Sequence, residues 1–138
     1  MKNNFLRKII WIIPIALIAF FLYMAFVYSA AELPGKPLYA QHCASCHGEN
    51  GEGVQLLIPP IANSDFAIKN FDSIPCWIKK GMSHAIVVNG KTFEQPMYPI
   101  NIDEIQITNI LDFIQKEMLK KEKTIDVNWT NKQLENCR

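Results

Sequence analysis

The sequence has little net charge and no block of positive charge. Its 138 residues carry 14 Lys and Arg against 13 Asp and Glu, which gives a formal net charge of +1 at pH 7. Nucleic-acid-binding domains usually present a concentrated basic face, so no nucleic-acid partner is indicated. The chain also lacks the G-K-[ST] element of a phosphate-binding loop, although residues 48–53 contain three glycines.

The sequence also has few residues of the kinds that build catalytic or zinc sites. It has four cysteines and three histidines, and no set of side chains has the pattern of a general acid, base and nucleophile. Structural zinc sites pair their ligands at short spacings, whereas Cys76 and Cys137 lie far apart. No βαβ pattern surrounds Cys43 and Cys46, which disfavours a thioredoxin-like site. We therefore predict that the chain is not itself an enzyme.

Charge is absent from residues 9–31, a run of 23 residues. A helix of that length spans roughly 34 Å, enough to cross a bilayer. Lys2, Arg7 and Lys8 precede the run, so residues 1–8 are predicted to be cytoplasmic and the remainder exported. The alternative is a cleaved signal peptide that leaves a soluble periplasmic protein, but apolar cores of signal peptides are usually shorter.

Beyond this anchor, residues 32–36 contain proline and glycine and are predicted to form a short linker. Residues 37–138 are predicted to form one small domain, which the linker would keep close to the membrane. The location expected is the bacterial inner membrane, with a single pass and the domain in the periplasm.

The most informative motif is Cys43-Ala44-Ser45-Cys46-His47. The pattern C-x-x-C-H is typical of c-type haem attachment. Each thiol can add to one vinyl group of a haem, and the adjacent His47 can then serve as an axial ligand to iron. We predict one haem c, covalently bound through Cys43 and Cys46.

A second axial ligand decides between an electron carrier and an open haem site. Met97 lies in Gln95-Pro96-Met97-Tyr98-Pro99, where two prolines restrict the loop and can present the thioether to iron. His84 is the main rival, and it would give a lower reduction potential than methionine. Met97 is the ligand predicted.

Local signals predict a mainly helical domain. The expected helices cover residues 37–45, 65–70, 73–80, 103–120 and 130–136, with Pro37 at the start of the first and Gly81 ending the third. Asn89-Gly90 between β-branched and aromatic residues predicts a hairpin over residues 85–93. In residues 103–120, capped by Asp103, the apolar positions recur at helical spacing and predict a core face: Ile107, Ile110, Leu111, Ile114 and Met118.

Two cysteines remain after the haem motif, Cys76 and Cys137. In an oxidising compartment such a pair commonly bridges, and we predict this disulfide. Closing a loop of about 60 residues would stabilise the fold by on the order of 4 kcal/mol in the chain-entropy model.

With the haem motif, Pro59-Pro60-Ile61 and Met97 in this order, residues 36–120 resemble a class I c-type cytochrome. More narrowly, the hairpin, Cys76 and Cys137 resemble those of small membrane-anchored bacterial monohaem cytochromes. The resemblance implies an all-α fold with orthogonal helices around one haem. It implies that helices 37–45 and 103–120 cross, with Tyr39 against Phe113. It also implies that the carbonyl of Pro59, with Pro60 as the alternative, accepts a hydrogen bond from His47.

The resemblance implies single-electron transfer in a respiratory chain. The donor would be a quinol-oxidising complex or another cytochrome, and the acceptor a terminal oxidase or reductase. The alternative function is a haem enzyme or gas sensor with an open or labile sixth site. It would differ from the carrier in the ferric spectrum and in the binding of external ligands.

Overall fold

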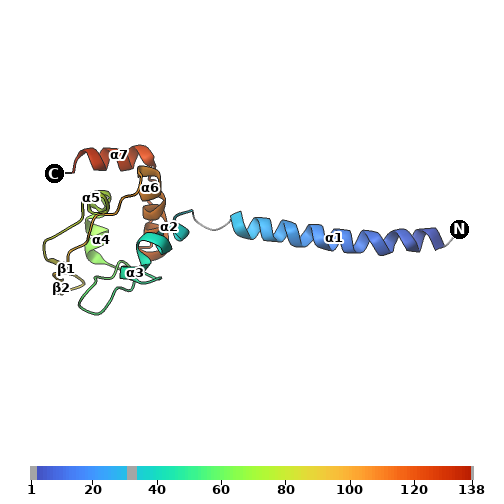
Figure 1. Ribbon diagram of the computed structural model, residues 1–138, viewed down its shortest axis with the longest axis horizontal. Coiled ribbons are helices and arrows are strands. Elements are labelled where there is room, and N and C mark those ends of the chain that lie inside the picture. The colour runs from blue at the N-terminus through green and yellow to red at the C-terminus, as the bar shows by residue number, and fades with distance from the viewer. Residues whose placement is uncertain (1–2, 31–33, 138) are drawn as a thin grey trace. The chain divides into compact units, whose positions relative to one another are not determined.

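The computed structural model describes the backbone of residues 3–30 and 34–137, and the side chains of residues 11–26 and 34–137. The chain divides into two compact units, Met1–Glu32 and Leu33–Arg138, which are described separately. The second unit is mostly helical with one two-stranded sheet (Figure 1).

The first unit is a single helix, α1 (Asn3–Ala30), which contains Pro14. Its described side chains are apolar and exposed, and Trp11, Phe21 and Phe26 are each about 70% accessible. Parts of the predicted anchor, residues 9–10 and 27–31, lie outside the described side chains. Within the part of the chain that the structure describes, no helix is long and apolar enough to cross a membrane.

The second unit begins with α2 (Gly35–His42), which is followed after Cys43 by the short helix α3 (Ala44–His47). The predicted start at Pro37 is wrong by two residues, because Pro34 takes the N-cap position and Gly35 is already helical and buried. Part of the segment expected as a linker therefore belongs to the folded unit. The turn at Cys43 divides the predicted helix 37–45 into two helices.

The longest helix of this unit is α6 (Glu104–Phe113), which begins with a reciprocal capping box between Asp103 and Gln106. It continues into a π-helical turn, η2 (Ile114–Met118), so the predicted helix 103–120 has the right position but is not regular to its end. The widened turn leaves the Met118 carbonyl to accept a hydrogen bond from the Asn63 amide, at 3.0 Å. The predicted core face is confirmed, since all five of its residues are buried.

Helices α2 and α6 pack closely against each other, as the resemblance implied. The rings of Tyr39 and Phe113 lie 5.5 Å apart. A Cβ atom on Gly35 would overlap the Asn109 carbonyl of α6. Because glycine has no side chain, Gly35 allows the two helices to approach this closely.

Along the chain, the segment between α3 and α6 contains α4 (Asp65–Lys69), η1 (Phe71–Ser73) and α5 (Ile74–Lys80). Ser64 caps α4 by accepting a hydrogen bond from the Ala67 amide. Gly81 ends α5, as predicted. The predicted hairpin is confirmed as β1 (Ile86–Val88) paired with β2 (Lys91–Phe93). Asn89 and Gly90 both have positive φ angles at its turn, 50° and 77°.

The last helix, α7 (Val127–Glu135), packs against α5 and α6 (Figure 1). It begins three residues before the predicted Thr130, because the Asp126 side chain caps it by accepting from the Trp129 amide. Cys137, which follows α7, forms a disulfide with Cys76 of α5, the pairing expected from the sequence. A buried hydrogen bond of 2.6 Å joins Thr108 of α6 to Thr130.

Candidate functional site

The two thiols of the C-x-x-C-H motif lie in different surroundings. Cys43 occupies the turn between α2 and α3 and is buried, whereas Cys46 lies on α3 and is exposed. Both are free thiols. Burial, and to a lesser extent the charge of Cys46, raises the pKa of Cys43 to about 11. The structure thus presents two unpaired thiols three residues apart, one inside the fold and one at its surface.

The ring of His47 is held by the backbone of the proline segment. Its Nδ1 atom lies 3.0 Å from the carbonyl oxygen of Pro59. Because a carbonyl can only accept, Nδ1 carries the proton, and Nε2 keeps its lone pair for a metal ion. Burial lowers the pKa of His47, and the hydrogen bond to Pro59 partly opposes this shift. A neutral, oriented imidazole is the form that ligates iron.

A glycine loop brings the proline segment to His47. Gly48, Gly51 and Gly53 all have φ angles between 71° and 81°, where other residues are strained. The Gly53 amide donates to the His47 carbonyl at 2.7 Å, and a Cβ on Gly53 would lie 2.8 Å from the carbonyl carbon of Pro59. From the sequence, only a phosphate-binding loop was excluded here. Three glycines directly after the motif were the signal for this close approach.

Tyr39 contacts both ends of the motif, a role that sequence reasoning missed. Its backbone carbonyl accepts from the Cys43 amide at 2.8 Å. Its hydroxyl donates to the carbonyl of Gly48, the residue after His47, also at 2.8 Å. Tyr39 is only 1% exposed. Burial, then the charges of Cys43 and Glu52, raises its pKa well above the ordinary value. The apolar pattern of the sequence predicts that this ring is buried in the core, but not that its hydroxyl contacts Gly48.

Met97 lies on a separate segment and is half-buried against the main hydrophobic core. It forms an isolated antiparallel pair with Met82, in which each amide donates to the other's carbonyl at 2.8 Å. The structure therefore joins His47 to Pro59 and Met97 to Met82. His47 is held by a side-chain hydrogen bond, and the Met97 segment is held by its backbone.

Other side chains of a kind that can ligate iron lie in less suitable places. His84, the main rival in the sequence, is exposed between α5 and β1. Met118 is 5% exposed in the core, and its sulfur atom lies against Gly51. His42 precedes Cys43 directly, and its Nε2 atom is buried without a hydrogen-bond partner among the described residues.

The residues present fit a covalently held haem. The two thiols are free, and the iron-binding nitrogen of His47 is not used by its hydrogen bond to Pro59. Val54, Leu56 and Leu57, directly before the proline segment, are 45%, 65% and 56% exposed, an apolar surface suited to a flat apolar group. No cluster of three or more His, Cys, Asp or Glu able to hold a bare metal ion occurs among the described residues.

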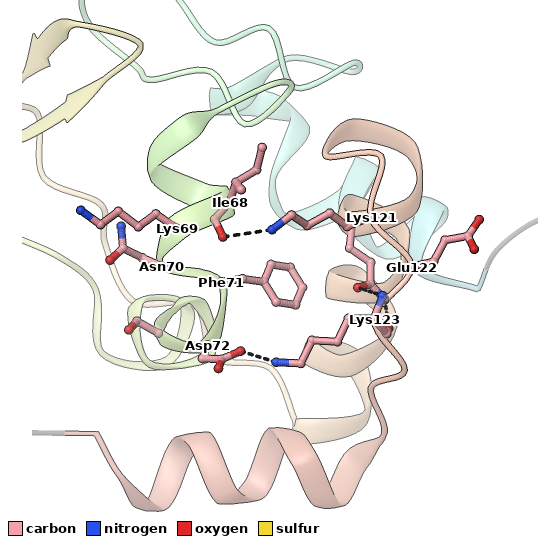
Figure 2. A pocket seen from close by; sticks show the side chains of 10 residues that line it. Ile68, Lys69, Asn70, Phe71, Asp72, Lys121, Glu122 and Lys123 are labelled. Atoms are coloured by element: carbon pink, nitrogen blue, oxygen red, sulfur yellow. Dashed lines mark hydrogen bonds and ion pairs between the residues drawn. The ribbon is translucent and has the colours of Figure 1, made fainter.

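A cavity of about 450 Å³ lies elsewhere, between residues 68–73 and residues 121–123. Figure 2 shows Lys121 and Lys123 reaching across it on either side of the Phe71 ring. Lys123 pairs with Asp72 at 2.6 Å, and Lys121 contacts the Ile68 carbonyl at 3.4 Å. Neither motif cysteine, His47 nor Met97 lines this cavity, so it is not part of the candidate site.

Comparison with known protein families identifies a match. The family model described as Cytochrome c matches residues 33–117, more than half of the chain. This range contains the C-x-x-C-H motif, the proline segment and Met97. No curated protein matches the sequence.

Proposed function

The chain belongs to the cytochrome c family, and we propose that it is a membrane-tethered carrier of single electrons with His47 and Met97 as axial ligands. Membership implies a covalently bound haem c and a role in electron transfer. The proposal adds three points: a single haem, the identity of both ligands, and the tether.

The observation that carries the proposal is the arrangement of Cys43, Cys46 and His47. The free thiols would hold the haem, and His47 would ligate its iron. When bound, the haem supplies an iron that alternates between the ferrous and ferric states. The Pro59 carbonyl keeps the proton of His47 on Nδ1, which orients the ring and strengthens Nε2 as a donor.

Met97 supports a carrier rather than an enzyme. A thioether ligand raises the reduction potential and fills the second axial position, which disfavours binding of a substrate to iron. Prolines at positions 96 and 99 restrict the segment, and the pair with Met82 fixes its backbone. The Met97 side chain is half-buried, as a ligand directed into the fold requires.

One redox titration followed by optical spectroscopy tests this assignment. Methionine ligation predicts a weak ferric absorption band at roughly 695 nm, together with a single one-electron transition. Met97→Leu should remove the band, whereas Met118→Leu, which changes a buried core methionine, should keep it. A wild-type ferric protein that is high-spin and binds cyanide rapidly would instead favour the haem enzyme or gas sensor.

The proposed tether rests on the uncharged run at residues 9–31 of the sequence. We expect the protein in the inner membrane with its haem domain in the periplasm, between a quinol-oxidising complex or cytochrome and a terminal oxidase or reductase. Mature protein should stay in the membrane fraction after high-salt and alkaline washes and keep its N-terminal residues. A soluble protein whose N-terminus begins near residue 32 would show that the segment is a cleaved signal peptide.

A further inference from the structure

The segment that carries Met97 is docked on the end of α5 by backbone contacts. Two are the reciprocal hydrogen bonds between Met82 and Met97, both 2.8 Å long. A third joins the Ile100 amide to the carbonyl of Ile78 in α5, also at 2.8 Å. These contacts fix the chain on both sides of the Tyr98-Pro99 dipeptide, so the backbone of Met97 has little freedom to move.

Gly81 lies directly under this segment. It ends α5 with φ 78° and ψ −179°, a conformation that essentially only glycine adopts without strain. A Cβ on Gly81 would lie 2.6 Å from the Met97 carbonyl oxygen and 3.1 Å from the Pro99 nitrogen. Real Cβ atoms do not come so close to a backbone oxygen, so any side chain at residue 81 must push the Met97 segment away.

Helix α5 is in turn held firmly by the rest of the fold. Its Cys76 is bridged to Cys137. The ammonium of Lys79 donates to the Ile102 carbonyl at 2.8 Å, and that of Lys80 donates to the Cys137 carbonyl at 3.0 Å. The end of α5 is therefore a fixed support, and the Met97 segment is the part that would shift if the two were forced apart.

We propose that the C-terminal end of α5 is the seat of Met97, and that Gly81 is the positioning residue that allows the Met97 backbone to dock there. This inference rests on the proposed function, because it takes Met97 to be the sixth ligand. Gly81 touches neither haem nor iron in this role. It acts through the Met97 carbonyl, and so determines whether the thioether can stay on the iron.

The test is Gly81→Ala in the full-length haem-bound protein. The displaced thioether should weaken or abolish the ferric absorption band assigned to methionine. It should also let imidazole bind to the ferric iron at least about tenfold more tightly, since a loss of about 1.4 kcal/mol in methionine ligation gives that factor. A lower reduction potential should accompany both changes.

Gly90→Ala is the matched control. Gly90 also has a positive φ, 77°, but a Cβ there would meet no heavy atom within 4 Å. This variant changes glycine to alanine at another positive φ without touching Met97. Its ferric band and imidazole affinity should remain those of the wild type. Equal effects in the two variants, or no effect in Gly81→Ala, would overturn the proposal that Gly81 allows Met97 to dock on α5.

Met97→Ala separates failure of the seat from failure of the ligand assignment. If Met97→Ala removes the ferric band but Gly81→Ala leaves it intact, the seat is wrong and Met97 remains the ligand. If Met97→Ala leaves the wild-type band and imidazole affinity unchanged, Met97 is not the ligand, and both proposals fall.

A measurement on the wild-type holoprotein covers the case in which Gly81→Ala does not fold. Amide hydrogen exchange followed by NMR should find the amides of Met82, Met97 and Ile100 protected, because all three are hydrogen-bonded in the seat. Exchange of the Met82 and Met97 amides at the rate of an unstructured chain would overturn the proposal without any variant.

Discussion

The segments around His47 and around Met97 hold their side chains by different means. On the motif side, residues 39–62, the hydrogen bonds that hold the motif are local: the Tyr39 hydroxyl donates to the Gly48 carbonyl, and the Pro59 carbonyl accepts from His47, 12 residues away. On the methionine side, residues 74–100, Met97 depends on α5, which is bridged to Cys137 across 61 residues. Changes on the motif side should therefore affect haem attachment. Changes on the methionine side should affect ligation by Met97, because the position of Met97 depends on contacts across the whole fold.

The largest effect is expected when both thiols of the motif are removed. The double variant Cys43→Ser/Cys46→Ser leaves no thiol in the motif to bond a haem, so covalent haem should be lost completely. A haem stain on a denaturing gel measures this directly. Cys76→Ser/Cys137→Ser removes the same number of sulfur atoms from the disulfide instead and should keep the stain. Covalent haem in the first variant would contradict the assignment of the motif.

The second-largest effect is expected when the disulfide that holds α5 is removed. Cys76→Ser/Cys137→Ser opens a loop with a sequence separation of 61 and should lower the free energy of unfolding by on the order of 4 kcal/mol. Urea unfolding measures the loss, and wild-type protein treated with a reductant should show a similar loss.

The same variant tests whether the two sides are independent. Amide exchange should accelerate more at Met97 and Ile100 than at Gly53, which belongs to the motif side. Equal acceleration on both sides would contradict the comparison, because it would mean that the disulfide stabilises the motif side as much as it does α5.

Disrupting the contact between α2 and α6, which supports the motif side, should cause a smaller loss in the free energy of unfolding. Gly35→Ala places a Cβ against the Asn109 carbonyl, and overpacking of this kind usually costs about 1–3 kcal/mol. Gln41→Ala, at an exposed position of the same helix, should change the free energy of unfolding by less than about 0.5 kcal/mol. Equal urea midpoints for the two variants would show that α2 can shift without cost.

Elements whose ends carry a local signal could be predicted from the sequence. Ser64 caps α4, Gly81 ends α5, Asn89-Gly90 forms the hairpin turn and Asp103 caps α6, and each acts within a few residues of itself. The C-x-x-C-H motif belongs to the same class. The start of α7 was missed although its cap, Asp126, is also local. The predicted start was Thr130.

Several features that depend on distant contacts could not be predicted, although the Cys76–Cys137 disulfide could. Gly35 is helical and buried because α6 packs on it, and the π-helical turn at η2 forms where the Met118 carbonyl meets Asn63. The role of Gly81 depends on the position of Met97, 16 residues later. The hydroxyl of Tyr39 finds its acceptor only when the glycine loop folds back. Residue type identifies such positions as core or turn, but not their partners.

The smallest effect should come from Tyr39→Phe on the motif side. The variant keeps the ring against Phe113 but removes the hydroxyl that donates to Gly48. Loss of one buried hydrogen bond should lower the free energy of unfolding by about 1 kcal/mol at pH 7. Tyr98→Phe removes a hydroxyl from a side chain that is 73% exposed and should have no measurable effect.

The dependence of stability on pH distinguishes the Tyr39 hydroxyl from simple packing. Burial is the main reason that the pKa of Tyr39 is raised in the folded chain, whereas an unfolded tyrosine ionises near pH ~10. Above that pH the unfolded chain releases a proton that the folded chain keeps, so the wild type should lose stability as pH rises. Tyr39→Phe cannot release this proton, so its fall between pH 9 and 11 should be shallower. An equally steep fall in urea unfolding would mean that Tyr39 ionises without opening the motif side.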